Sequence, residues 1–140
     1  MTLSTIGQGF LLGDGLVGDP LFYAQGTPTS LTSSATLTVD QIGNRMFKCN
    51  AATGAGVTYT LPTAAAMDAA YPSIQNNMAI EISFTNVSTV AAEDATIAAG
   101  TGWTLYGNVV VASNNAATDW STRTFVLIKT GTAAWSLYGK

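Results

Sequence analysis

The sequence predicts an all-β protein: an antiparallel, jelly-roll-like β-sandwich with one short helix and an extended N-terminal arm. Apolar and polar residues alternate with a period of two in seven or eight short segments, which is typical of half-buried strands. β-Branched and aromatic residues dominate these segments, and Gly, Asn and Pro separate them. Short strands with frequent turns favour a sandwich or a barrel. We expect residues 1–30 to form the arm and residues 31–140 the β-sandwich domain.

The arm, residues 1–30, is interrupted throughout by glycine and by two prolines. No helical or strand period continues for more than a few residues, which indicates an extended or looped segment outside a packed layer. Its apolar side chains are unfavourable in free solution, so we expect them to dock on the chain's own domain, on a neighbouring subunit or on another protein. The candidate partner-binding residues are Phe10, Leu11, Leu12, Leu21, Phe22 and Tyr23.

Alternating segments follow one another from residue 35 onwards. Within residues 78–85, Met78, Ile80, Ile82 and Phe84 share one face, and polar or small residues occupy the other. A loop at residues 130–132, Thr-Gly-Thr, separates the last two segments and predicts a hairpin. The expected strands cover residues 35–39, 57–61, 78–86, 95–98, 103–106, 109–112, 120–130 and 133–139.

One alanine-rich stretch, LPTAAAMDAAYP at residues 61–72, departs from the strand pattern. Pro62 cannot donate to a strand ladder, and Thr63 is a suitable N-cap for a helix. Residues 64–71 have high helix propensity, with Met67 and Tyr71 on one face, and Pro72 ends the stretch. We expect a two-turn helix that caps one end of the sandwich.

Composition excludes several classes of function. Charged residues make up 9% of the chain and the net charge is −3, with five scattered cations, so we expect no nucleic-acid partner. No apolar run approaches the roughly 20 residues of a membrane span, and we expect no membrane partner. The N-terminus lacks the pattern of a secretory signal, which favours synthesis and assembly in a cytoplasm.

The side chains needed for most catalysis are missing or isolated. The chain has no histidine, which removes Ser-His-Asp catalysis, and one cysteine, which removes a zinc cluster and an intrachain disulfide. Cys49 lies in a strand-like pattern, and we expect a buried apolar residue in preference to a reactive thiol. We therefore expect no enzyme activity and no catalytic, metal or cofactor site.

Several short motifs have a functional and a structural interpretation. The glycines of GDGLVG, at residues 13–18, match the dinucleotide-binding spacing, but no helical pattern follows them. Asp14 and Asp19 lack the alternating ligands of a calcium loop. The sequence NVS, at residues 86–88, has the spacing of a glycosylation acceptor, and we interpret it as chance.

Two further sets of residues remain open to interpretation. Glu93 and Asp94 form the one adjacent acidic pair, and we expect a solvated turn in preference to paired catalytic carboxylates. Trp103, Trp120 and Trp135 favour the core or a subunit interface, with a sugar-stacking platform as the alternative.

Three segments resemble a domain of tailed-bacteriophage virion proteins. They are SATLTVDQIGNRMFKC, GVTYTLPTAAAMDAAYPSIQNNMAIEISFTNVST and ATIAAGTGWTLYGNVVVASNNAATDW, and the resemblance covers about residues 31–138. The phrases at residues 61–66 and 98–103 are the most similar. The resemblance is to virion structural proteins of the head decoration (cement) and head-fibre type, which are commonly trimers of β-sandwich domains.

This resemblance implies a decoration protein that binds the outer capsid surface and clamps neighbouring major capsid subunits. The implied partners are the major capsid protein and further copies of the chain, most simply as a homotrimer, with the virion as its location. Two alternatives stay open: a head-fibre or tail-fibre adhesion module that binds host-surface glycans or receptors, and another structural part such as a capsid subunit, tail component or connector.

Overall fold

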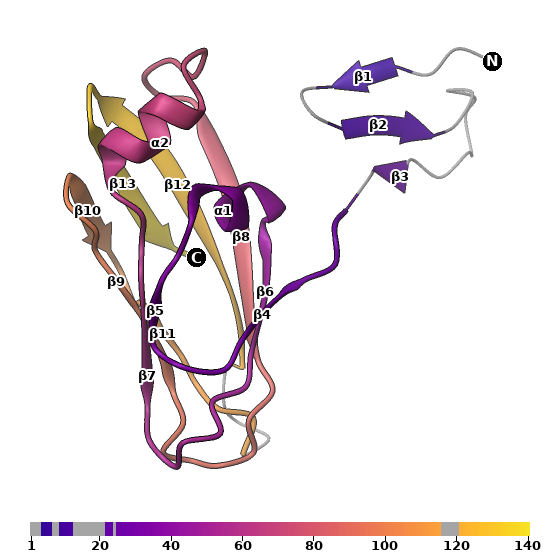
Figure 1. Ribbon diagram of the computed structural model, residues 1–140, viewed down its shortest axis with the longest axis vertical. Helices are drawn as coiled ribbons and strands as arrows, with labels where there is room; N and C mark the ends of the chain where they lie inside the picture. Colours follow the sequence, from indigo (N-terminus) through magenta and orange to yellow (C-terminus); the bar gives the residue numbers. More distant parts are fainter. Residues whose placement is uncertain (1–3, 7–8, 13–21, 24, 116–120) are drawn as a thin grey trace.

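The protein is β-rich, with two short helices among the residues that the structure describes. The computed structural model describes residues 4–6, 9–12, 22–23, 25–115 and 121–140, and the side chains of the last two ranges. Its strands form a six-stranded, a four-stranded and a three-stranded sheet (Figure 1). The predicted β class is therefore confirmed.

The six-stranded sheet contains the longest strands of the chain. Its order is β10-β13-β12-β8-β6-β4, with β10 and β4 at the edges. The central strands β8, β12 and β13 pair antiparallel, whereas β10, β6 and β4 join them through parallel pairs. The strands are β4 (Thr29–Leu31), β6 (Met46–Cys49), β8 (Ala79–Asn86), β10 (Trp103–Tyr106), β12 (Thr122–Gly131) and β13 (Ala134–Gly139).

The four-stranded sheet has the order β11-β9-β7-β5 and is also mixed. β5 and β9 both run parallel to β7, and β11 is antiparallel to β9. The sheets are thus mixed and not antiparallel throughout, because the chain repeatedly crosses between the two sheets and returns in the same direction. The strands are β5 (Ala35–Thr36), β7 (Val57–Thr60), β9 (Ala95–Ala98) and β11 (Val110–Val111).

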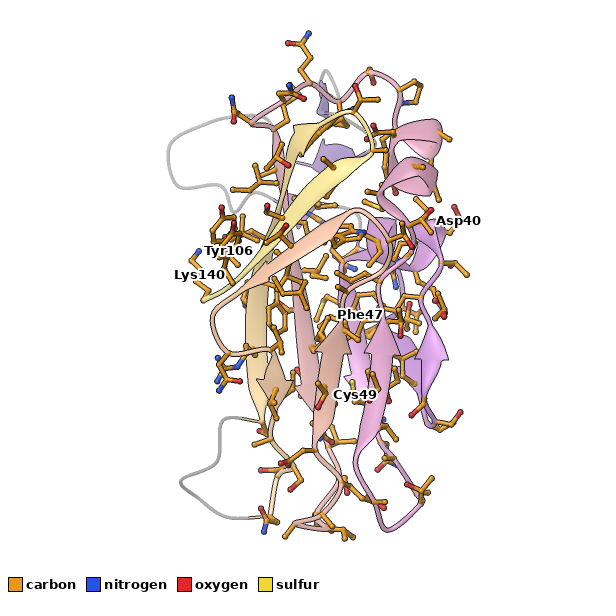
Figure 2. All side chains as sticks on the ribbon, turned by 90° about the vertical axis from the view of Figure 1, so that its left-hand side faces the viewer. Asp40, Phe47, Cys49, Tyr106 and Lys140 are labelled. Atoms are coloured by element: carbon orange, nitrogen blue, oxygen red, sulfur yellow. The ribbon has the colours of Figure 1, made fainter. Side chains whose placement is uncertain are left out.

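The two sheets face each other across one apolar core. The ring of Tyr59, on β7, lies 6.3 Å from that of Phe84, on β8, so the contact joins the sheets. Phe84 also stacks on Phe47 at 4.3 Å and meets Phe125 edge-on at 5.9 Å. Figure 2 shows Phe47 and Cys49 inside the body. Alternation places these residues inward, as the period-two pattern predicts.

Helix α2 (Ala64–Ala70) confirms the expectation for the alanine-rich stretch. The hydroxyl of Thr63 accepts a hydrogen bond from the Ala66 amide at 3.1 Å, which is the predicted N-cap. Met67 is buried in the core, and the helix ends at Tyr71, just before Pro72. Figure 1 places α2 at the upper end of the two sheets.

Helix α1 (Val39–Asn44) lies where the sequence predicted the end of a strand. The Thr38 hydroxyl accepts from the Gln41 amide, and the Gln41 side chain accepts from the Thr38 amide at 2.9 Å. This reciprocal pair is a capping box, whose T-x-x-Q signature is readable in the sequence. The expected strand at residues 35–39 is therefore wrong beyond Thr36, because the cap diverts the chain into a helix.

The other expected strands are confirmed within a few residues at each end. Residues 95–98 and 103–106 match β9 and β10 at both ends. The last two strands form the predicted hairpin, but the turn lies at Thr132 and Ala133, one residue later than expected.

Part of the arm forms a small sheet of its own. β1 (Ser4–Ile6), β2 (Gly9–Leu12) and β3 (Phe22–Tyr23) pair antiparallel in sequence order. Figure 1 draws these strands to one side of the two larger sheets. Thr29 and Ser30, at the end of the expected arm, belong to β4 and pair with Phe47 and Lys48.

Candidate functional site

The two phrases most similar to virion proteins lie against each other in the structure. The Leu61 amide donates to the Ala98 carbonyl at 2.9 Å, and the Ala64 amide donates to the Thr101 carbonyl at 2.9 Å. The indole N–H of Trp103 donates to the buried carbonyl of Pro62 at 2.6 Å. The phrases therefore form one structural joint, which connects β7 and α2 to the crossing between β9 and β10.

Two glycines allow this close approach. A β-carbon on Gly100 would collide with the carbonyls of Leu61 and Pro62. Gly102 has a φ of +87°, and a β-carbon there would collide with the Ala133 carbonyl and with the β-carbon of Ala64. The A-A-G-T-G-W phrase is thus explained by backbone packing around a buried tryptophan.

Asp68 joins α2 to the turn of the β12–β13 hairpin. Its carboxylate accepts from the Ala133 amide and the Trp135 indole, both at 2.8 Å, and pairs with Lys129 Nζ at 3.0 Å. The hydrogen bond from Ala133, followed by those from Trp135 and Lys129, lowers the pKa of Asp68 to about 2. This contact fixes one end of the body.

The tryptophans that the structure describes belong to the core. Trp103 and Trp135 are 8% and 3% exposed, and their ring centroids lie 5.6 Å apart. The expectation of a core position is confirmed for these two, and they offer no open ring face for a sugar. Trp120 lies outside the described residues.

An exposed aromatic pair lies on the same two strands. Tyr106 and Tyr138 are 48% and 41% exposed, and their rings stack with centroids 4.9 Å apart and planes 13° apart. Sequence reasoning missed this pair, although the signal is visible. β10 and β13 carry the near-identical motifs WTLYG and WSLYG, which pair parallel and in register, so that Trp meets Trp and Tyr meets Tyr.

These tyrosines belong to the outer face of the six-stranded sheet, which we define as the side chains pointing away from the core. The face is rich in hydroxyl and apolar groups, and its one described ion pair joins Glu81 to Lys140 at 2.7 Å. Figure 2 shows Tyr106 and Lys140 at the edge of this view. The outer face consists of Ser30, Met46, Lys48, Ala79, Glu81, Ser83, Thr85, Thr104, Tyr106, Thr122, Thr124, Val126, Ile128, Ser136 and Tyr138.

The expectation of a solvated turn at Glu93 is wrong. The Glu93 side chain is buried, where its carboxylate accepts from the Ser88 hydroxyl and, at 2.7 Å, from the Gly54 amide. The Ser88 bond, followed by the Gly54 bond, lowers the pKa of Glu93. Asp94 accepts from the Ser113 amide at 2.9 Å. The two carboxylates thus hold different loops.

The sequence NVS is part of the same buried network. Asn86 is 1% exposed, and its amide group donates to the Glu93 carbonyl at 2.8 Å and to the Val111 carbonyl at 3.3 Å. A folded chain therefore does not present this asparagine for glycosylation. Its role is to satisfy backbone groups between the sheets.

Cys49 is buried, as the sequence predicted. The side chain is 0% exposed, and burial raises the pKa of the thiol to about 12, although a hydrogen bond with Tyr59 lowers it in part. A neutral, enclosed thiol is a poor nucleophile and a poor metal ligand. Within the described ranges, no group of three or more acidic or cysteine residues could hold a metal ion.

The predicted arm residues are brought together in part. Phe10, Leu11 and Leu12 lie in β2, and Leu11 and Leu12 pair with Tyr23 and Phe22 of β3. Sequence proximity alone did not indicate this pairing. Leu21, the GDGLVG motif, Asp14 and Asp19 lie outside the described residues.

In the described residues, the buried polar side chains hold loops and turns together, and the outer face of the six-stranded sheet is the broadest exposed surface feature described. Neither of the two described helices is long and apolar enough to cross a bilayer. Comparisons of the chain with protein-family models, with curated proteins and with solved structures found no match.

Proposed function

We propose that the chain is a head decoration (cement) protein of a tailed bacteriophage, which binds the outer capsid surface and clamps neighbouring major capsid subunits. The observation that carries the proposal is the outer face of the six-stranded sheet, which is broad and poor in charge. Its exposed tyrosines and methionine lie among threonine and serine hydroxyls. The cores of protein interfaces combine aromatic residues and methionine with few charges.

The use of the buried polar groups supports a binding role. Asn86, Ser88 and Glu93 hold backbone amides and carbonyls of two loops, at residues 50–56 and 87–94, and of β11, and Asp68 holds a hairpin turn. Decoration requires a rigid body that presents a surface and no reacting groups. We therefore propose that the protein is not an enzyme and takes no cofactor.

In this proposal the two facing sheets are a mixed-sheet variant of the jelly-roll-like sandwich of virion proteins. The apolar side chains of the arm dock on the capsid and add contact area to the interface. A homotrimer places one subunit on each capsid subunit around a threefold or quasi-threefold position. Assembly takes place in the host cytoplasm, on the virion surface, without contact to nucleic acid or membrane.

The test is binding of the purified chain to heads of its own phage that lack it. The full chain should co-sediment with these heads in a fixed ratio to the major capsid protein. A variant lacking residues 1–23 keeps β4 and the rest of the body, and it should lose most of this binding. Its unfolding temperature shows whether the body is intact. Failure of the full chain to bind contradicts the function; equal binding by the shortened chain contradicts the arm mechanism alone.

A second candidate is an adhesion module of a head fibre or tail fibre that binds host-surface glycans. The stacked, exposed Tyr106 and Tyr138 favour it, because sugars stack on accessible aromatic rings. Binding on a glycan array that Tyr106→Ala abolishes would support this candidate. An array without a binder would remove it and leave decoration in place.

A further inference from the structure

The edge strand β10 offers unpaired backbone groups to a partner. An open sheet edge is a template for pairing with another chain, and proteins normally protect it by a short strand, a charge, a proline or a bulge. Four edges are described in the two large sheets: β10 and β4 in one, β11 and β5 in the other.

Three of these edges carry a recognisable protection. β5 and β11 are two residues long, too short to seed a ladder. β4 has three residues and follows Pro28, and the Asn44 side chain covers its start by bonds to the Thr27 carbonyl and the Thr29 hydroxyl. β10 has four residues, with no charge, proline or register shift.

The direction of the free groups on β10 follows from its pairing with β13. The Trp135 amide donates to the Gly102 carbonyl at 3.0 Å, so the backbone of residue 102 points toward β13. Successive residues of a strand point to alternate sides, which directs the N–H and C=O of Leu105 away from β13. Leu105 therefore presents one donor and one acceptor at the open edge.

We propose that β10 pairs antiparallel with β10 of a second copy of the chain, about a twofold axis at Leu105. Residues directly opposite in an antiparallel pair share one face of the sheet. Leu105 opposite its counterpart satisfies this rule on the inner face. Thr104 opposite Tyr106 of the second copy satisfies it on the outer face. The pairing joins two six-stranded sheets into one continuous sheet and extends the aromatic outer face across the axis.

A second copy suits this edge better than an unrelated strand for two reasons. The segment from Trp103 to Tyr106 is uncharged, so the twofold pairing opposes no like charges. The strand already accepts a near-identical neighbour, since β13 pairs with it residue by residue through the same Trp-x-Leu-Tyr pattern. Twofold contacts are also the commonest between identical chains.

This pairing is independent of capsid binding and differs from a trimer contact. Because the contact is twofold, it generates dimers of whatever unit the remaining surface forms. A monomeric unit gives a dimer, and the proposed trimer gives a hexamer or larger even assemblies. A species with an odd number of chains at all concentrations contradicts it.

The register is tested by oxidative cross-linking of the full chain carrying Leu105→Cys. Opposite positions in an antiparallel pair lie within disulfide range, so this variant should give a covalent dimer on treatment with a mild oxidant. The native thiol does not interfere, because Cys49 is buried. Thr58→Cys is the matched control, since it is exposed on β7, which has neighbours on both sides, and it should stay monomeric on a denaturing gel.

A second measurement protects the proposal against failure of one variant to fold. Thr104→Lys places a charge on an exposed position of the edge and should shift the oligomer to half its mass in analytical ultracentrifugation. Thr58→Lys should leave the mass unchanged. Absence of a Leu105→Cys dimer from folded protein, or equal masses for the two lysine variants, overturns the proposal.

Discussion

The indole N–H of Trp135, on β13, donates to the carboxylate of Asp68, on α2, at 2.8 Å. The same carboxylate accepts from the Ala133 amide, where φ is +48° in the hairpin turn. One side chain thus holds a non-glycine residue in a left-handed conformation and orients the buried tryptophan that packs on Trp103. The end of the body near α2 depends on this contact.

Asp68→Asn should lower the unfolding temperature and change its dependence on pH. The pKa of Asp68 falls from 3.8 to about 2 in the folded protein, so its contribution is complete above pH 3.8 and is lost as the pH falls toward 2. In thermal unfolding scans, the unfolding temperature of Asp68→Asn should therefore decrease less between pH 4 and pH 2 than that of the unchanged protein. Glu81→Gln, in the exposed pair with Lys140, should change stability little at neutral pH. If the unfolding temperatures of Asp68→Asn and of the unchanged protein decrease equally at acid pH, the account is contradicted.

Gly102→Ala should destabilise the protein more than Gly54→Ala. Both glycines have a positive φ, +87° and +70°, so both substitutions carry the same kind of backbone strain. A β-carbon meets the Ala133 carbonyl and Ala64 at position 102 but nothing within 4 Å at position 54. We expect the loss at position 102 to exceed that at position 54 by more than about 1 kcal/mol in urea unfolding. Equal losses would show that the joint is not closely packed.

Phe84→Ala should cost about 3–5 kcal/mol of unfolding free energy. Its ring contacts Phe47 and Phe125 within one sheet and Tyr59 across the core, so truncation opens a cavity between the sheets. Met78→Ala serves as the control, because Met78 is 48% exposed and should cost less than about 0.5 kcal/mol. Urea unfolding measures both, and a loss at Phe84 no larger than the control would contradict the facing arrangement of the sheets.

Cys49 should react with a thiol reagent only when the body opens. Its pKa of about 12 and its 0% exposure leave almost no accessible thiolate at mildly alkaline pH. Labelling by Ellman's reagent should therefore follow the urea unfolding curve measured by tryptophan fluorescence. Rapid stoichiometric labelling of the folded protein would place the thiol at the surface.

Local signals in the sequence predicted most elements correctly. Pro62, Thr63 and the alanines define α2, and the alternation of residues 78–85 defines β8. At α1 the alternation of residues 35–39 predicted a strand, whereas the Thr38–Gln41 capping box begins a helix. Both patterns overlap at Thr38 and Val39, and the capping box satisfies two backbone donors at the start of the helix.

Long-range contacts could not be read from the sequence. Glu93 is buried because Gly54, 39 residues earlier, supplies an amide, and Asp68 meets Ala133 across 65 residues. The parallel pairs depend on which sheet the chain enters after each crossing. The outer face could be predicted strand by strand, but its continuity and the Tyr106–Tyr138 stack required the strand order.

The most direct measurement of the central claim is a reconstruction of the intact phage particle at a resolution that traces the chain. The account predicts the two sheets on the outside of the head, at threefold and quasi-threefold positions, with the N-terminal segment lying across a boundary between major capsid subunits. Finding the chain at a fibre tip, inside the shell or nowhere in the particle would contradict it.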